Sequence, residues 1–174
     1  MISRLRRPAI LVPLAALAGL LAAAGWFFQP WTAFVDHAVH ERSPAATPGI
    51  RVLATGEFTG REYPTRGTAV LYGLPDGSQL LRLEGLDTHN GPWLKVALVD
   101  HLNAGGTPAR YVDLGDVKGN VGEANYPLPV GAEYPIPEAP GTGSDAAVVP
   151  TVVIWSRFGP AHGTAALVPV LPAS

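Results

Sequence analysis

Residues 67–86, GTAVLYGLPDGSQLLRLEGL, decide the fold class because two apolar runs lie on either side of a turn signal. Each run has the length of a β-strand and is bounded by glycine or proline. Between them, Pro75 presets φ, Asp76 can bond nearby backbone amides, and Gly77 tolerates a left-handed conformation. The stretch therefore predicts a β-hairpin.

The same alternation of short apolar runs with glycine and proline continues over residues 50–174. In one run, Leu94, Val96 and Leu98 recur at every second position, which suits a sheet with one buried face. No helical period of useful length occurs in this region, and residues 138–145, EAPGTGSD, have the composition of a loop. The predicted strands are 51–58, 67–74, 78–86, 93–100, 110–114, 148–155 and 165–170. About seven such strands predict an all-β fold, a single antiparallel β-sandwich-like or barrel-like domain.

Residues 1–29 have the pattern of a membrane anchor. Three arginines precede the apolar stretch 10–28, whose length is close to the ~20 residues that a membrane-spanning helix needs. Basic residues before such a stretch favour an inside N-terminus, which predicts a single-pass protein of the cell membrane with the β domain outside. The alanines at 22–24 also fit a signal-peptidase site, so a cleaved signal peptide is the alternative.

Residues 30–49 predict a short amphipathic helix and then a linker. Pro30 suits a first helical position, and apolar side chains follow at helical spacing as far as Val39. His37 and His40 lie one turn apart on the polar face, where we expect solvated side chains rather than metal ligands. Residues 43–49, SPAATPG, predict a proline-rich spacer.

The composition excludes several classes of protein. Without its three N-terminal arginines the chain keeps 9 of its 12 basic residues against 14 acidic ones, a net charge near −5. That charge argues against nucleic-acid binding. The absence of cysteine excludes disulfides, thiolate zinc sites and iron–sulfur clusters, and the only methionine is Met1. We predict no metal site, and no cofactor is evident from the residues.

Four stretches of the chain resemble the DM-thirteen domain, a family described as an electron-transfer domain and found beside DOMON domains in some animal proteins. Together they span residues 53–167. They are GEF at 56–58 leading to GTA at 67–69, LRLEGL at 81–86 followed by NGPWL at 90–94, YVDLGDVKGNVGEANYPLP at 111–129, and VVIWSRF at 152–158 followed by GTAAL at 163–167. The resemblance implies an extracytoplasmic domain, behind one membrane segment in bacterial members, and a role in electron transfer.

One position departs from the family pattern. After the tryptophan of the penultimate strand, Trp155, the family has a cysteine and this chain has Ser156. A serine hydroxyl neither forms an alkoxide readily near neutral pH nor follows the oxidation chemistry of sulfur. No nucleophile-elbow motif surrounds Ser156 either, so we predict no catalytic residue. We therefore expect a binding or envelope-associated domain without catalysis, with electron transfer as the alternative.

Residues 111–129 allow two interpretations. In the structural one, Gly115, Gly119 and Gly122 adopt positive φ and specify a tight hairpin and a compact loop. In the functional one, polar and aromatic side chains line a pocket for a sugar or another polar ligand. The candidate site residues are Tyr111, Asp113, Lys118, Asn120, Asn125 and Tyr126, together with Trp155 and Ser156.

Three further expectations concern a calcium site, two tryptophans and one histidine. Asp and Asn residues near its glycines could bind calcium, although their spacing is not that of a 12-residue calcium loop. Trp93 and Trp155 are expected in the core because each lies in or beside an apolar strand. His89 is expected to be exposed in a turn.

The predicted partners are the membrane and either an envelope protein or a small polar ligand.

Overall fold

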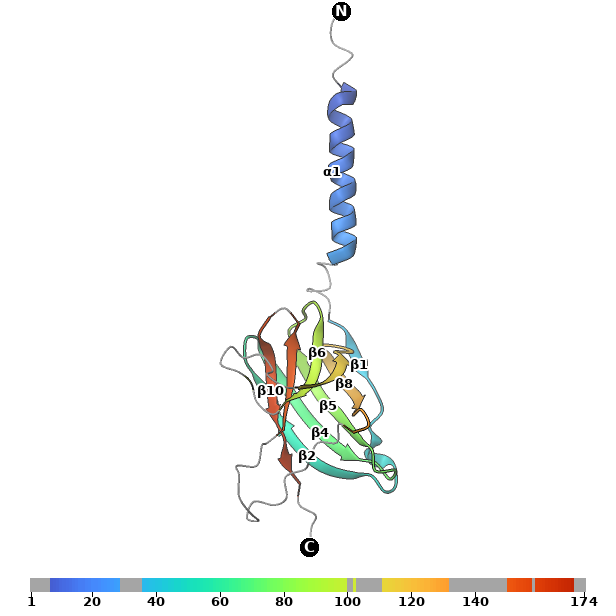
Figure 1. Cartoon of the computed structure of the whole chain (residues 1–174), viewed down its shortest axis with the longest axis vertical. Helices are drawn as coiled ribbons and strands as arrows, with labels where there is room; N and C mark the ends of the chain where they lie inside the picture. The colour runs from blue at the N-terminus through green and yellow to red at the C-terminus, as the bar shows by residue number, and fades with distance from the viewer. Residues whose placement is uncertain are drawn as a thin grey trace, which may run out of the picture. The chain divides into compact units, whose positions relative to one another are not determined.

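The computed structural model describes residues 7–28, 36–99, 102, 111–131, 150–157 and 159–170 (Figure 1). These residues belong to two compact units, 1–35 and 36–174, which we describe separately. The predicted loop 138–145 lies outside the described residues.

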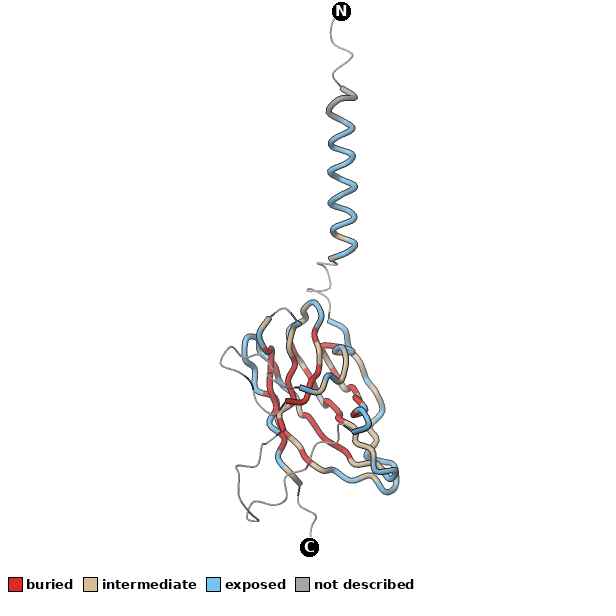
Figure 2. The backbone as a smooth tube through the Cα atoms, in the orientation of Figure 1, coloured by how far each residue is buried: buried red, intermediate tan, exposed pale blue. Residues whose placement is uncertain are grey.

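The first unit contains one helix, α1 (Arg7–Phe28), with Pro13 inside it. Residues 11–27 are nearly all exposed (Figure 2). Of the helices that the structure describes, none has the length and apolarity that crossing a membrane requires. A helix in residues 1–29 is thus confirmed, whereas the prediction that it spans a membrane is without support.

The second unit consists of two sheets, which confirms the predicted all-β, sandwich-like architecture. A six-stranded sheet has the order β1-β8-β5-β4-β2-β11, and a five-stranded sheet has the order β3-β10-β9-β6-β7. All neighbouring strands are antiparallel except β1 and β8, which are parallel. The strands of the first sheet are β1 (Ala38–His40), β2 (Arg51–Glu57), β4 (Thr65–Gly73), β5 (Gln79–Thr88), β8 (Val121–Pro127) and β11 (Val168–Pro169), and those of the second are β3 (Thr59–Gly60), β6 (Leu94–Val99), β7 (Tyr111–Asp116), β9 (Thr151–Ser156) and β10 (Ala161–Ala166).

The predicted hairpin is the pair of strands β4 and β5, which meet at Gly73 and Gln79. In the turn between them, the Asp76 carboxylate accepts hydrogen bonds from the backbone and the hydroxyl of Ser78, at 3.0 and 2.6 Å. Gly77 has a φ of 86°, as the turn signal requires. Local turn chemistry therefore sets the register of the central strands.

The main core lies between the two sheets (Figure 2). The six-stranded sheet contributes buried side chains such as Leu71, Leu81 and Leu83, and the five-stranded sheet contributes Val96 and Ile154 among others. Because successive side chains of a strand point to opposite faces, the alternate residues of the five-stranded sheet form a second cluster. That cluster contains Ala97, Val99, Val153 and Ala161, with Leu102 and Trp155 packed against it.

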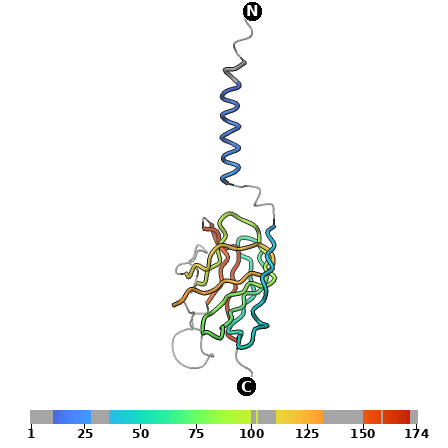
Figure 3. The backbone as a smooth tube through the Cα atoms, turned by 90° about the vertical axis from the view of Figure 1, so that its right-hand side faces the viewer, coloured from blue at the N-terminus to red at the C-terminus, as the bar shows by residue number. Residues whose placement is uncertain are grey.

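The predicted helix after residue 30 is wrong where the structure describes it. Residues 38–40 form the strand β1, and Val39 lies opposite Gly122 of β8. Figure 3 shows this segment running along one side of the β domain. The apolar residues do recur at helical spacing, but pairing with β8 outweighs that local preference. Within the predicted spacer, residues Pro44–Ala46 form the short 3₁₀ helix η2, capped by Ser43.

The tight hairpin predicted within residues 111–129 is also wrong. Strand β7 pairs with β6 in the five-stranded sheet, whereas β8 pairs with β5 in the other sheet. Residues 117–120 therefore cross from one sheet to the other. The predicted strand 165–170 divides in a similar way, because β10 and β11 belong to different sheets and Leu167 between them is buried.

Candidate functional site

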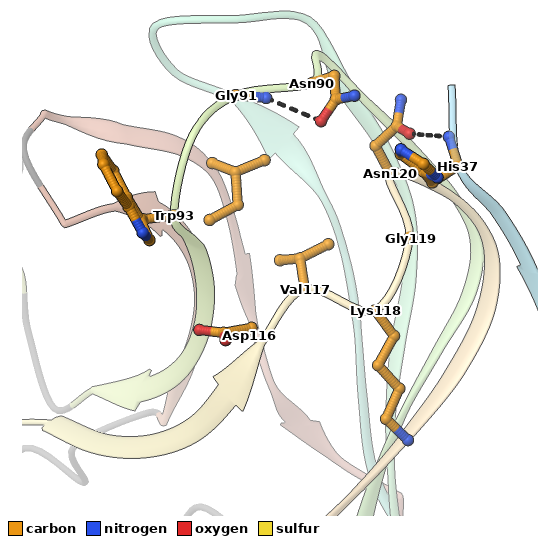
Figure 4. A pocket seen from close by; sticks show the side chains of 10 residues that line it. His37, Asn90, Gly91, Trp93, Asp116, Val117, Lys118, Gly119 and Asn120 are labelled. Atoms are coloured by element: carbon orange, nitrogen blue, oxygen red, sulfur yellow. Dashed lines mark hydrogen bonds between the residues drawn. The ribbon is translucent and has the colours of Figure 1, made fainter. Parts of the chain in front are cut away.

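A pocket of about 240 Å³ opens where the sheet-crossing segment 116–120 approaches the loop 89–93, between β5 and β6 (Figure 4). Its apolar floor is formed by Leu94 and Val117, and the backbone N–H of Val117 donates to the carbonyl of Leu94 at 2.8 Å. Ten residues line it: His37, Asn90, Gly91, Trp93, Leu94, Asp116, Val117, Lys118, Gly119 and Asn120.

The side chains around this floor differ from one side to the other. Figure 4 shows Trp93 and Asp116 on one side, and Asn90, Asn120 and His37 on the other. An aromatic ring, a carboxylate and amides thus surround an apolar floor. Such a combination of an apolar surface with a few polar groups is typical of small-molecule sites.

The backbone of Trp93 has an unusual conformation, and its side chain is exposed. Its φ is 51°, the one positive φ of a residue other than glycine in the described part of the chain. The left-handed conformation is unfavourable for a bulky residue, and such strain is concentrated at functional sites. The side chain is 53% exposed, so the expectation that Trp93 belongs to the core is wrong.

The loop that carries Trp93 is fastened to the end of β9. The Ser156 hydroxyl donates to the Pro92 carbonyl at 3.2 Å, and the Arg157 N–H donates to the Trp93 carbonyl at 3.3 Å. Ser156 is therefore a support for the pocket loop.

Asn120 builds one wall of the pocket through three hydrogen bonds. Its Oδ1 accepts from the backbone N–H of His37 at 2.7 Å, and its Nδ2 donates to the Asp36 carboxylate at 2.7 Å and the Thr88 carbonyl at 3.1 Å. Because the Asn120 side chain is buried and these bonds use its acceptor and both donors, it positions His37 and needs no ligand.

Lys118 lines the pocket, but its side chain points away from it (Figure 4). Its ammonium donates to Glu41 Oε1 at 2.7 Å and to the Asn125 carbonyl at 2.8 Å, and it lies 5.3 Å from the centre of the Tyr126 ring. The hydrogen bond from Lys118 is the main reason that the pKa of Glu41 is lowered. The backbone N–H of Lys118 donates to the Tyr126 phenol oxygen at 3.0 Å, and burial raises the pKa of that phenol.

Asn125 belongs to the same network, behind the pocket. Its Oδ1 accepts from the buried guanidinium of Arg82 at 2.9 Å, and its Nδ2 donates to the Arg42 carbonyl at 3.0 Å. Arg82 also donates to the Glu41 carbonyl and pairs with Glu84. Asn125 thus holds the segment after β1 against β8, whereas Tyr126 holds the backbone of Lys118.

The remaining candidates lie away from the pocket, towards the second core cluster. The rings of Tyr111 and Trp155 meet edge to face, with centroids 5.4 Å apart. Asp113 accepts from Lys95 at 2.9 Å and from the backbone N–H of Gly115 at 2.8 Å. Burial acts to raise the pKa of Asp113, but these two donors outweigh it and the net shift is downward. The same ion pair raises the pKa of Lys95.

The candidate residues therefore separate into four groups. Lys118 and Asn120 line the pocket, Asn125 and Tyr126 contact Lys118, and Ser156 supports the pocket loop, whereas the other three lie elsewhere. Asn90 and Asp116 were not among the residues predicted for a site, and Trp93 was expected in the core. The motif NGPW at 90–93 was the available signal, because glycine and proline after an exposed histidine mark an irregular loop. His89 is indeed exposed.

Within the described ranges, no three histidine, aspartate or glutamate side chains gather as metal ligands would. No protein-family model matches the chain, and neither does any curated protein or solved structure. The fold and the pocket define a class, that of two-sheet β domains with a small pocket of mixed polarity. The resemblance to the DM-thirteen family stays a prediction.

Proposed function

We propose that this protein is a non-catalytic binding domain whose pocket takes a small neutral saccharide, about one sugar ring in size. The observation that carries the proposal is the half-exposed indole of Trp93, held in a strained conformation beside an apolar floor and the Asp116 carboxylate. A pyranose offers matching surfaces, since C–H groups cover its faces and hydroxyls surround its rim.

The chemistry of the lining supports a saccharide over other small ligands. The Trp93 face and the side chains of Leu94 and Val117 can contact the C–H groups of a sugar. Asp116 can accept from hydroxyls, and the Asn90 side chain, whose Oδ1 accepts from the Gly91 N–H at 3.0 Å, adds a polar group to the rim. At about 240 Å³ the pocket is smaller than the 300–1,000 Å³ typical of drug-sized ligands, which favours a single ring.

Charge favours a neutral ligand. Asp116 is the acidic member of the described lining, and its side chain is largely exposed. The ammonium of Lys118 is engaged with Glu41 and Asn125 and points away from the pocket. The Asp116 carboxylate is itself paired with the Lys95 ammonium at 3.3 Å, so the polar rim carries little net charge, which suits a neutral sugar.

The same lining supports binding without hydrolysis. Glycosidases need two carboxyl groups on either side of the scissile bond. In the described lining Asp116 is the one carboxylate, and the nearby Asp36 is bound to the Asn120 side chain. One carboxylate can hold a sugar. It cannot be the general acid and, at the same time, the second group that glycoside hydrolysis needs as general base or nucleophile.

The electron-transfer role implied by the family resemblance is the weaker proposal. It depends on a residue at position 156 that can cycle between oxidation states, and here the Ser156 hydroxyl supports the Pro92 carbonyl instead. The apolar sequence of residues 10–28 and the three arginines before it support export, so we propose that the domain acts in the cell envelope.

Isothermal calorimetry of the full chain against a panel of neutral, acidic and amino sugars tests the proposal. We expect at least one neutral monosaccharide or disaccharide to bind, and Trp93→Ala to weaken that binding about tenfold, because roughly 1.4 kcal/mol of ring contact is lost. Trp155→Phe is the matched control, since Trp155 lies outside the pocket, and it should bind as the wild type does. A panel without any binding sugar, or equal affinity of Trp93→Ala, contradicts the proposal.

A further inference from the structure

His162 lies buried directly behind the pocket loop. It is on β10 and is only 4% exposed. Its ring is hydrogen-bonded to the backbone of His89 and packs on Tyr63, with centroids 4.4 Å apart. Its Nδ1 is buried without a hydrogen-bond partner. A Cβ on Gly91, a residue that lines the pocket, would lie 3.2 Å from His162 Cε1, so loop and imidazole are in close contact.

The groups that face His162 come from three elements. Glu62 and Tyr63 follow β3, His89 and Gly91 belong to the loop after β5, and Thr65 of β4 donates to the His162 carbonyl at 3.2 Å. Burial is the largest influence and lowers the pKa of His162. The hydrogen bond to the His89 backbone and the charge of Glu62 act in the opposite direction, and the ring of His89 adds to the lowering.

We propose that His162 is an acid switch for the pocket: its protonation displaces the loop 89–93 and releases the ligand. The displacement of the loop stands on the geometry alone, whereas the release of a saccharide rests on the proposed function. Above the pH at which it titrates, His162 is neutral, Nδ1 carries no proton, and the loop packs against the ring.

Protonation gives the buried His162 ring a second N–H group and a positive charge. A proton from solvent binds Nδ1 and creates a buried N–H without an acceptor on a ring that now bears a positive charge. Water can satisfy that N–H if the contact with Gly91 opens. Because Asn90, Gly91 and Trp93 come from this same loop, opening it removes lining residues from both sides of the pocket. Acid should therefore loosen the pocket while the sheets stay intact.

Tyr63 packs against both the loop and His162. The rings of His89 and Tyr63 stack at 4.9 Å with an interplanar angle of 11°, and the ring of Tyr63 also contacts that of His162. Tyr63 thus connects the exposed histidine of the loop to the buried one of β10.

An NMR titration of the full chain without ligand, from about pH 8 to pH 5, tests the switch. We expect the His162 ring to titrate below its ordinary pKa of 6.5, and the Gly91 amide and the Trp93 indole signals to shift with the same midpoint. In His162→Gln, which keeps a donor for the His89 backbone but cannot become charged, the loop signals should stay constant. His40→Gln, on the exposed β1, is the matched control and should keep the wild-type response.

Two further measurements complete the test. Gly91→Ala places a methyl group against the ring, so its loop signals at pH 7.5 should resemble those of the wild type in acid. Saccharide affinity in the wild type should fall about tenfold between pH 7.5 and pH 5, and in His162→Gln it should stay nearly constant. Loop signals that stay still while His162 titrates, or that shift in His162→Gln, overturn the switch. A loop that moves in a protein that binds no saccharide at either pH sustains the switch and contradicts the proposed function alone.

Discussion

The carboxylate of Glu41 lies 2.7 Å from the ammonium of Lys118, a residue 77 positions further along the chain. The second carboxylate oxygen of Glu41 accepts from the backbone N–H of Asn125 at 2.6 Å, and the Glu41 N–H donates to the Glu123 carbonyl at 3.0 Å. One side chain thus pairs with the sheet-crossing segment and covers the outer edge of β8. Unpaired edges invite association with other chains, so this contact protects the sheet.

Glu41→Gln should destabilise the β domain by about 0.5–1 kcal/mol at neutral pH, since the ion pair with Lys118 is partly exposed. The pKa of Glu41 is lowered in the folded protein, chiefly by Lys118. Its contribution is therefore present above the ordinary pKa of 4.5 and is lost as the pH falls through the folded value. Urea denaturation between pH 3 and 7 measures the difference. Glu57→Gln, at an exposed position of β2, should be neutral throughout, and an equal loss in both variants would contradict the assignment.

Asn120→Asp should lower the free energy of unfolding of the β domain, because it replaces one atom, the Nδ2 of residue 120, by an oxygen. The substitution keeps the acceptor for the His37 N–H but replaces the donor that faces the Asp36 carboxylate. Two carboxylates in contact repel each other, and the Thr88 carbonyl loses its donor, which together cost roughly 1–3 kcal/mol. Chemical denaturation should show part of this loss recovered in the double variant Asp36→Asn with Asn120→Asp. Additive effects of the two substitutions would show that the side chains do not interact.

Gly122→Ala should detach β1 from β8. Gly122 has a φ of 107°, and a Cβ there would lie 2.2 Å from the Val39 carbonyl oxygen. Gly115 has a similar φ of 111° but open space around it, so Gly115→Ala has the same backbone strain without the collision. Hydrogen exchange should show loss of protection at residues 38–41 in Gly122→Ala alone. Equal exchange in the two variants would show that the close approach of β1 is unimportant.

Ser156→Ala should reduce saccharide affinity a few-fold and leave the fold stable. The serine hydroxyl supports the Pro92 carbonyl, and one such hydrogen bond is worth about 0.5–1.5 kcal/mol. Calorimetry and thermal unfolding separate the two effects. An unchanged affinity would mean that the loop 89–93 keeps its conformation without this support.

The predictable part of the fold depends on local chemistry. The turn at Pro75, Asp76 and Gly77 specifies the β4–β5 hairpin because its hydrogen bonds are all made within a few residues. In contrast, β8 was not predicted as a strand. Two of its buried residues, Gly122 and Ala124, are small and do not produce the apolar alternation that indicates a strand. Its buried alternation becomes visible only once the sheet exists.

The unpredicted parts depend on contacts between distant residues. Val39 has neighbours at helical spacing, but the pairing of β1 with β8 is absent from any local pattern. The exposure of Trp93 follows from one backbone angle, and the apolar strand beside it points to burial instead. Lys118 and Asn120 were singled out by their types in a glycine-rich run, although their partners Glu41 and Asp36 lie about 80 residues away.

The most direct test of the central claim is amide chemical-shift mapping of the full chain with a saturating neutral saccharide. The account predicts that the perturbed residues cluster in the loop 89–93 and the segment 116–120, and that the Trp93 indole shifts among them. Perturbations confined to the surface around Tyr111, Asp113 and Trp155, or no perturbation by any saccharide that is tried, would contradict it.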